Sequence, residues 1–519
     1  MNLRPFAPFS ASVAVTATLI ARLLLAIALM GPAAAEAACP LDGFPAPAGD
    51  IDHAYAEDLD AFITASLRYV GATPGLAVGI VENDRVIYAR GFGRRDLEDC
   101  QPVTAATRFY LLSLTKSFTG MAAALLQERG ELALDQPLTS FFPNLTMAAP
   151  INPAQTSLRD LLTHRPGFWN GGINYRSSAP GNLDDATIRY LLEKHSRPAA
   201  IDFTYSNLGY VIAAAAIRQA TGKGWRQLLE EEIFARIGMA ATTTDIAEAQ
   251  RHEFARPYAM LQDGGFEPRP IKVQGQMHAA GGAVSTLGDL LRWVRLNLAE
   301  GRLDNQQVIP AAVVRQAHAP QIQYDWKFGD YHRFAYGLGL HNADLDGELT
   351  LHHFGGPIHL SFQPRRQRGL VVLSAGPDST RFVHQLAAHL YRLLDRPADP
   401  PEAEDVFAEL HELGQKRLGE RAERRAQLAA RQSPLHRPAA SYAGTYRNDR
   451  LGEIQLLDRD GEVELRYGVL IQVLRPLEAD TFAADLLPLG GSVSILEYQA
   501  EDGGALLWGE RRFDRIAEP

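Results

Sequence analysis

Apolar residues in the first third of the chain follow two different patterns. Residues 76–81 and 86–89 are short apolar runs separated by an Asn-Asp pair, which is typical of two strands joined by a tight turn. From Ser113 the apolar residues instead recur at intervals of three and four until Gly130. That spacing predicts a helix, and glycine is a common stop signal for one.

The same patterns continue through the middle of the chain. Helical spacing predicts helices at 157–163, 184–194, 207–220, 225–236 and 285–299. Strand-like runs return at 349–352 and 370–373, and an amphipathic helix at 380–394 follows them. Strands at both ends of this region predict a sheet whose N- and C-terminal parts meet, with the middle helices as a layer or subdomain beside it. The predicted fold class is therefore α+β.

The pattern changes once more towards the C-terminus. Residues 396–401, rich in Pro and Asp, indicate a boundary, and the charged helix predicted at 402–432 is interpreted as a solvated connector. From Tyr442 the pattern is all β, and the runs 453–457 and 462–467 flank an Asp-Gly pair that favours a hairpin. A small all-β C-terminal domain is predicted.

Composition is that of a globular protein with more than one domain. The chain has 519 residues, 46% of them hydrophobic and 22% charged, which is too long for a single ordinary core. Its formal net charge is −10, so a nucleic-acid partner is not expected.

Residues 1–38 have the pattern of a signal peptide. Arg4 precedes an apolar run at about 12–31, and the small residues at 33–38 suit cleavage. Arg22 interrupts the run, which makes it a poor membrane span, although a retained anchor stays open as the alternative. The rest of the sequence has no comparable apolar run, so a periplasmic or secreted protein without a membrane span is predicted.

Two cysteines, Cys39 and Cys100, would both enter an oxidising compartment, where a bridge between them is expected. If Cys39 survives cleavage of the signal peptide, the loop of roughly 60 residues that it closes should contribute about 4 kcal/mol in the chain-entropy model. Intact mass of the exported protein without reductant measures the bridge directly. Two free thiols, the alternative, would contradict it.

The first candidate chemical motif is Ser113-Leu114-Thr115-Lys116, at the start of a predicted helix. Residues three apart share a helix face, so the lysine amine can reach the serine oxygen and accept its proton. The positive helix end lowers the pKa of a nearby amine, and its free N–H groups can stabilise an oxyanion. Of the six lysines, only Lys116 has a serine three residues before it.

The second motif is Tyr205-Ser206-Asn207, at the turn before a predicted helix. A tyrosine beside a lysine ammonium can be held as phenolate and act as a general base. The Asn207 amide can bridge the lysine and a substrate carbonyl. A packed tyrosine followed by a capping asparagine is the alternative.

The third motif is His353-Phe354-Gly355-Gly356, on a late strand. Small residues there allow a substrate backbone to lie along the strand edge, and a free N–H can complete an oxyanion hole. A glycine bulge without function is the alternative.

Together the motifs resemble the penicillin-recognising serine hydrolases, the group of class C β-lactamases, D-Ala-D-Ala carboxypeptidases and related esterases. The order S-x-x-K, Y-x-N and H/K-x-G matches, and the resemblance covers about 55–395. It implies a transpeptidase-like sheet flanked by helices, with a helical subdomain. The segment 442–446 resembles the lipocalin-like β domain appended to many members. The expected divisions are a signal peptide at 1–38, the hydrolase domain at 50–396, a charged helical linker at 397–436 and the β domain at 437–519.

The resemblance also implies a role for each residue that matches a motif. Ser113 would be the acylated nucleophile and Lys116 its proton partner. Tyr205 would act as general base and then as general acid, and Asn207 would contact the substrate amide. His164, in a segment similar to one of the family, is interpreted as structural.

The third motif departs from the family pattern at two positions. His353 takes the place that lysine holds in β-lactamases, and Phe354 stands where threonine or serine is usual. Gly355 keeps the glycine, and the backbone N–H groups of Gly356 and Ser113 would form the oxyanion hole. Because the usual hydroxyl helps to hold a substrate carboxylate, Phe354 puts carboxylate recognition in doubt.

The predicted function is hydrolysis of a small ester, amide or peptide through an acyl-enzyme, with no metal and no cofactor. A peptidase acting on D-amino-acid peptides of the cell wall is one alternative. A non-catalytic penicillin-binding sensor module, of a different class, is another. Neither G-x-S-x-G nor H-E-x-x-H occurs, which disfavours a lipase-type triad and a zinc hydrolase. The oligomeric state stays open.

Overall fold

The structure of the chain is a computed structural model that describes residues 56–516, apart from 179, 182, 396–397, 485, 487–492 and 502–503. The predicted signal peptide at 1–38 lies outside the described residues. Cys100 is disulfide-bonded, and Cys39 also lies outside the described residues, so their pairing stays a prediction.

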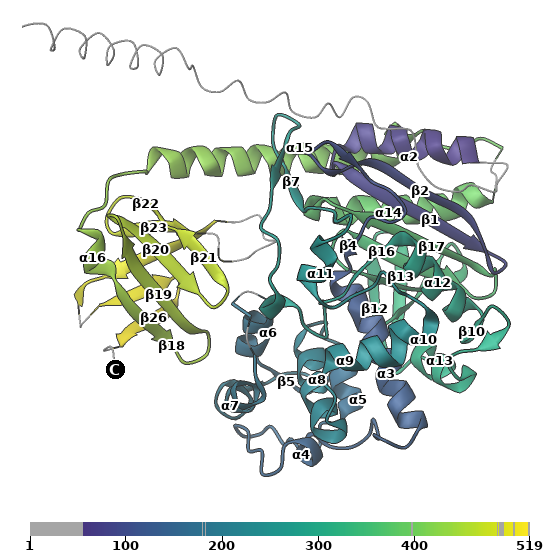
Figure 1. Ribbon diagram of the computed structural model, residues 1–519, viewed down its shortest axis with the longest axis horizontal. Coiled ribbons are helices and arrows are strands. Elements are labelled where there is room, and N and C mark those ends of the chain that lie inside the picture. Colours follow the sequence, from purple (N-terminus) through teal and green to yellow (C-terminus); the bar gives the residue numbers. More distant parts are fainter. Residues whose placement is uncertain are drawn as a thin grey trace, which may run out of the picture.

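The larger body of the molecule is built on one antiparallel sheet (Figure 1). In spatial order its strands are β12 (Ile322–Phe328), β13 (Tyr331–Tyr336), β14 (His341–Leu345), β15 (Glu348–Phe354), β16 (Ile358–Gln363), β17 (Arg368–Ser374), β1 (Gly75–Glu82), β2 (Arg85–Asp96) and β3 (Gln101–Pro102). The N-terminal strand β1 pairs with the late strand β17, with Leu76 opposite Ser374. The predicted meeting of the two ends of the domain in one sheet is therefore confirmed.

The β1–β2 hairpin forms where the sequence predicts it. Asn83 and Asp84 turn the chain with φ of 49° and 63°, a left-handed conformation that short polar side chains tolerate better than others. Along β1, Val78 packs into the core on one face and Ala77 into the core on the other. Side chains of a strand alternate between faces, so a strand buried on both sides shows an uninterrupted apolar run.

Helices cover both faces of the sheet. The remaining helices of the body are α2 (Ala56–Val70), α3 (Thr115–Glu128), α4 (Leu138–Phe141), α5 (Leu158–Leu162), α6 (Gly171–Ser178), α7 (Asp185–His195), α8 (Leu208–Thr221), α9 (Trp225–Leu229), α10 (Ala235–Ile237), α11 (Ile246–Gln250), α12 (Leu287–Leu298), α13 (Ala311–His318) and α14 (Thr380–Leu394). Helices α2 and α14 pack on one face, and α3 and α12 on the other. Helices α4 to α9 gather below the sheet as the predicted helical subdomain (Figure 1).

Two predictions about elements need correction. The helix expected at 225–236 is interrupted by a π-helical turn at Glu230–Phe234 between α9 and α10. Five strands of the main sheet, β3, β12, β13, β14 and β16, were not predicted. Strand β12 reads Ile-Gln-Tyr-Asp-Trp-Lys-Phe and strand β16 reads Ile-His-Leu-Ser-Phe-Gln, so both alternate apolar and polar residues, and this strand signal was present in the sequence but missed.

The long helix α15 (Ala403–Ala430) leads to a separate β domain (Figure 1). That domain is a nine-stranded antiparallel sheet, in the order β21 (Leu470–Val473), β20 (Glu462–Tyr467), β19 (Gly452–Arg459), β18 (Gly444–Asn448), β26 (Arg511–Ile516), β25 (Ala505–Trp508), β24 (Ser494–Gln499), β23 (Thr481–Ala484) and β22 (Arg475–Pro476). A short helix, α16 (Ala439–Tyr442), precedes it. The hairpin predicted at the Asp-Gly pair joins β19 to β20.

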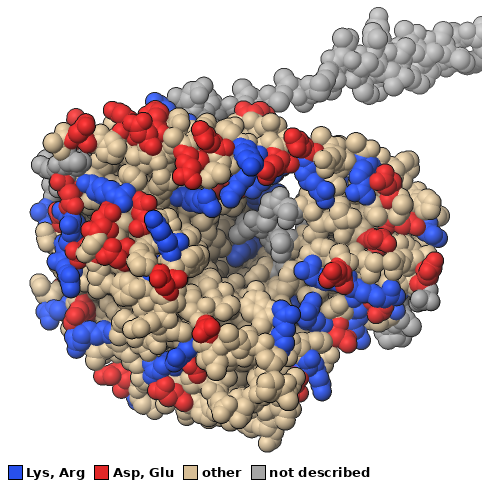
Figure 2. All heavy atoms as spheres, turned by 180° about the vertical axis from the view of Figure 1, so that it is seen from behind, with Lys and Arg blue, Asp and Glu red and all other residues tan. Residues whose placement is uncertain are grey.

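The β domain packs against helix α6 of the larger body. The ring of Tyr175 on α6 lies 5.2 Å from that of Trp508 and 6.1 Å from that of Tyr467. Figure 2 shows the surface hollowed between the two parts, with acidic and basic side chains interspersed around the hollow. Across the described part of the chain, no helix has both the length and the apolar character needed to cross a membrane.

Candidate active site

Ser113 lies in a turn that is anchored on both sides. The short strand β4 (Phe109–Tyr110) pairs with β9 (Val284–Ser285), and a 3₁₀ turn at Leu112–Leu114 then leads into α3. Leu112 adopts φ of 46°, a left-handed conformation that costs a non-glycine residue about 1–2 kcal/mol. Strained residues of this kind cluster at functional sites. Ser113 itself stays partly exposed, whereas Thr115 and the residues after it are buried.

Lys116 is fully buried one helical turn after Ser113. Its Nζ lies 3.0 Å from Ser113 Oγ, 2.8 Å from Asn207 Oδ1 and 2.9 Å from the carbonyl oxygen of Ala280. Burial lowers the pKa of Lys116 well below its usual value, and the positive charge of Lys272 lowers it further. None of its three partners is a carboxylate that would hold a proton on the amine. The site therefore favours a neutral amine.

Tyr205 lies just before α8, close to both residues. Lys116 Nζ stands 5.0 Å from the centre of its ring. The Tyr205 hydroxyl is buried, and among the described residues it makes no well-formed hydrogen bond. Burial raises the pKa of Tyr205 above its usual value, and the Ser113 hydroxyl and the Arg333 charge only partly offset this. The structure thus favours a neutral phenol. The phenolate expected from the sequence required a lysine ammonium, which burial disfavours.

Two further side chains fix the turn that carries Tyr205. The backbone N–H of Asn207 donates to Asn174 Oδ1 at 3.2 Å. The ring of His164 lies 4.6 Å from that of Tyr205, and its Nδ1 accepts the N–H of Ser206 at 3.4 Å. Burial lowers the pKa of His164 well below its usual value, so the ring is neutral. His164 therefore supports the turn without carrying charge.

His353 is fully buried on β15. Its Nε2 is 3.4 Å from the Tyr336 hydroxyl, and its Nδ1 is 2.7 Å from the carbonyl oxygen of Phe354. Burial lowers the pKa of His353 well below its usual value. The imidazole is therefore neutral and does not supply the positive charge that a lysine would bring to this position.

The end of β15 approaches the Ser113 turn so closely that only glycine fits. A Cβ on Gly355 would stand 2.1 Å from the carbonyl oxygen of Leu111 and 2.9 Å from the backbone nitrogen of Ser113. The N–H of Gly355 donates to the carbonyl of Ile358 at 2.9 Å. Gly356 follows with φ of 57°. The structure thus brings the third motif against the first, while the oxyanion hole of Ser113 and Gly356 stays a prediction.

Phe354, at the end of β15, lies beside Tyr205. Its half-buried ring is 6.2 Å from the Tyr205 ring and stacks on Phe328 at 5.0 Å. The Arg333 guanidinium lies 4.8 Å from the ring of Phe354. Arg333 is fully buried, its two terminal nitrogens have no partner among the described residues, and burial lowers its pKa to about 10. Arg333 was not predicted as a site residue, because it belongs to no motif and its strand, β13, was not predicted.

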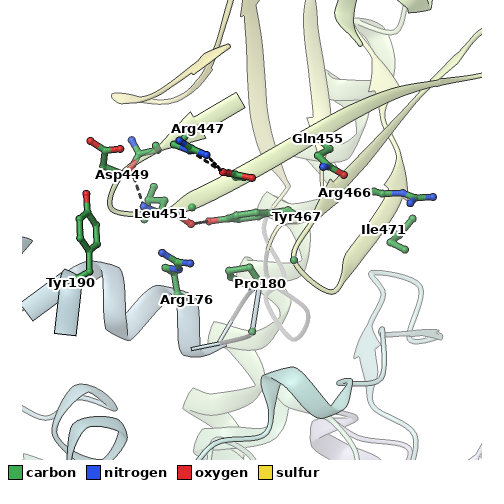
Figure 3. Close-up of a pocket in the computed structure, with 15 residues that line it drawn as sticks. Arg176, Pro180, Tyr190, Arg447, Asp449, Leu451, Gln455, Arg466, Tyr467 and Ile471 are labelled. Atoms are coloured by element: carbon green, nitrogen blue, oxygen red, sulfur yellow. Dashed lines mark hydrogen bonds and ion pairs between the residues drawn. The ribbon is translucent and has the colours of Figure 1, made fainter. Parts of the chain in front are cut away.

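A separate cavity of about 710 Å³ lies between the β domain and helices α6 and α7. Figure 3 shows Arg176 and Tyr190 on the helices facing Arg447 and Asp449 of the β domain. Its lining does not include Ser113. In the described ranges, no group of three or more His, Cys, Asp or Glu side chains is arranged to hold a metal ion.

Comparisons with known proteins agree with this geometry. The family model described as Beta-lactamase matches residues 59–393. The chain is 27% identical to the unguisins hydrolase ungD of Aspergillus violaceofuscus, over 43% of this chain and 41% of that protein. It is 26% identical to a beta-lactamase of Escherichia coli K12, over 52% of this chain and 66% of that protein.

A solved structure extends the similarity to the fold of most of the chain. The octameric penicillin-binding protein homologue from Pyrococcus abyssi aligns with a TM-score of 0.57 and 22% identity, over 88% of this chain and 99% of that one. This likeness concerns the fold alone. The chain spans about two fifths of the length of the two Aspergillus relatives, so their activities do not transfer directly.

Proposed function

Because the chain belongs to the β-lactamase family, we propose that it is a serine hydrolase that cleaves an ester or amide bond through an acyl-enzyme on Ser113. Lys116 is the proton acceptor, and Tyr205 is the proton donor to the leaving group. Asn207 and the backbone N–H groups of Ser113 and Gly356 hold the substrate carbonyl.

The observation that carries this proposal is the surroundings of Lys116 Nζ. Asn207 Oδ1 and the Ala280 carbonyl oxygen can only accept hydrogen bonds, so each takes one N–H of the amine. A neutral amine has two N–H groups and one lone pair. The third neighbour is Ser113 Oγ, at 3.0 Å from Nζ. With the amine neutral, we infer that this oxygen faces the lone pair and that its O–H donates to the amine. A buried, neutral lysine placed in this way is a base ready to activate the serine.

The proton balance of one turnover follows from these protonation states. Lys116 takes the proton of Ser113 as Oγ bonds to the substrate carbonyl carbon, and the N–H groups stabilise the oxyanion. Tyr205, a neutral phenol, gives its proton to the departing oxygen or nitrogen. The Lys116 ammonium then returns a proton to the phenolate. A water molecule then attacks the carbonyl carbon of the acyl-enzyme with the same two proton transfers. This step releases the acid and restores Ser113.

A peptidase for D-amino-acid peptides is the second candidate. Its support is the similarity to a D-aminopeptidase of Gluconobacter oxydans, 24% identical over 57% of this chain. A screen of p-nitrophenyl esters, nitrocefin and D-amino-acid p-nitroanilides, followed by intact mass, separates the possibilities. A persistent acyl adduct without turnover would instead identify a penicillin-binding sensor module.

Phe354 should lower the activity of the enzyme on substrates that carry a carboxylate on the leaving-group side. Its ring cannot donate a hydrogen bond, and it lies 6.2 Å from the ring of Tyr205 and 4.8 Å from the Arg333 guanidinium. We expect poor hydrolysis of penicillins and of peptides ending in D-Ala, and better hydrolysis of neutral short-chain esters. Phe354→Thr supplies a hydroxyl and removes one of the rings packed on Arg333, so it should shift kcat/KM towards nitrocefin relative to p-nitrophenyl acetate by about tenfold or more.

That ratio is measured in the wild type and in Phe354→Thr, with the melting temperature of each. A wild-type enzyme that strongly prefers nitrocefin would contradict the expectation without any mutant. An unchanged ratio in a folded Phe354→Thr would assign the ring a packing role only.

We also propose that the enzyme acts outside the cytoplasm. The support is the pattern of residues 1–38, a charged start, an apolar run and small residues before Cys39. Sequencing the N-terminus of the protein recovered from the periplasm or medium of the producing cells tests it.

A further inference from the structure

A second buried lysine, Lys272, lies beside the turn that carries the nucleophile. It is only 8% exposed, and its backbone N–H donates to the Tyr110 hydroxyl at 2.8 Å. Its Nζ lies 5.9 Å from the centre of the Tyr110 ring. Tyr110 belongs to strand β4, which leads directly into Ser113. Lys272 is thus held beside Tyr110, on the strand that leads into the turn of the nucleophile.

This amine has no counter-charge. Among the described residues no carboxylate or carbonyl pairs with it, and burial alone lowers its pKa, to about 8. At pH 7 Lys272 therefore remains mostly protonated. An unpaired buried charge is costly, and such groups are normally paired or bind a ligand. The mechanism proposed above does not use this charge.

His278 adds a second unpaired polar group at the same wall. Its Nδ1 is buried and has no hydrogen-bond partner in the part of the chain that the structure describes. Burial lowers the pKa of His278 well below its usual value, and the positive charge of Lys272 lowers it further. A Cβ on Gly281 would touch both the His278 ring, at 3.4 Å, and the carbonyl carbon of Leu112, at 3.5 Å. The imidazole and Leu112, the residue just before Ser113, therefore both lie next to Gly281.

We propose that Lys272, with His278 beside it, recognises a carboxylate on the acyl part of the substrate. The inference rests on the proposed hydrolase function and names its substrate class, acyl donors that carry a negative charge away from the scissile carbonyl. An incoming carboxylate supplies the missing counter-charge of Lys272, and the neutral imidazole can donate one hydrogen bond to it.

The position of Lys272 assigns the charge to the acyl side. Tyr205 protonates the leaving group, so it marks the leaving-group side, where Phe354 lies 6.2 Å from its ring. The Arg333 guanidinium lies 4.8 Å from the ring of Phe354, whereas Lys272 Nζ lies 5.9 Å from the ring of Tyr110, on the strand that precedes Ser113. The predicted substrate has an uncharged leaving group and an anionic acyl group.

The test compares two esters with acyl chains of the same length, p-nitrophenyl hydrogen glutarate and p-nitrophenyl valerate. The wild type should prefer the glutarate in kcat/KM, mainly through a lower KM. Lys272→Gln should reduce the glutarate-to-valerate ratio by about tenfold to a hundredfold, the range of a hydrogen bond to a charged group. Lys272→Glu should reduce it further, and Lys272→Arg, which keeps the charge, should retain part of the preference. Lys194→Gln, at an exposed lysine on α7, is the matched control.

The outcomes separate this inference from the proposed function. Hydrolysis of both esters with a ratio that Lys272→Gln does not change overturns the carboxylate site and leaves the hydrolase intact. An equal loss on both esters also overturns it, because Lys272 would then act on proton transfer by Lys116. If neither ester is hydrolysed and a fluorophosphonate does not label Ser113, the proposed function itself fails. Melting temperatures of all variants exclude loss of folding as the cause of a changed ratio.

Discussion

Ser113→Ala should lose turnover by about 10⁴-fold or more, because no other group can form the acyl-enzyme. The hydroxyl lies 3.0 Å from a buried amine and at the start of α3, so both its activation and the stabilisation of the oxyanion depend on this one position. A fluorophosphonate should add one adduct to the wild type and none to the variant, as measured by intact mass.

Ser117→Ala is the matched control in the same helix. The Ser117 hydroxyl is buried and donates to the carbonyl oxygen of Leu114 at 2.8 Å, away from the amine of Lys116. This variant should keep both activity and labelling. Full-stoichiometry labelling of Ser113→Ala would remove Ser113 from the role of nucleophile, whatever happened to turnover.

Lys116→Arg should be nearly as inactive as Lys116→Ala, each losing about 10²- to 10⁴-fold in the rate of acylation. Arginine keeps the charge but never deprotonates in proteins, so it cannot accept the proton of Ser113. The surroundings of Lys116 also disfavour a permanent charge, since the residue is fully buried and lacks a carboxylate partner among the described residues. The measurement is the rate of fluorophosphonate labelling of Ser113.

The pH dependence of the same rate gives a second check. Only the neutral amine accepts a proton, so the wild-type rate should fall as the pH is lowered through the depressed pKa of Lys116. Lys194→Arg, at an exposed lysine of α7, should behave as the wild type. Retention of most activity by Lys116→Arg would reduce Lys116 to an electrostatic anchor and pass the role of base to another group.

Local rules of the chain were enough to predict several parts of the molecule. The S-x-x-K spacing on a helix face places Lys116 Nζ next to Ser113 Oγ wherever that helix lies, because residues three apart are neighbours on a helix. The β1–β2 hairpin follows from two residues that tolerate positive φ. The meeting of β1 with β17 was also predictable, because the strands stand at the two ends of one predicted domain. Family resemblance added the order of the motifs.

Only the tertiary structure decided the protonation states and the specificity of the site. Whether Lys116 is an ammonium or an amine depends on burial among segments far apart in sequence, since Asn207 and Ala280 complete its surroundings. The same burial makes Tyr205 a phenol rather than the expected phenolate. Lys272 carries no motif, and its place beside Tyr110 arises from a contact across 162 residues. A sequence pattern records the types and spacing of residues, whereas desolvation and unpaired charge belong to the packed interior.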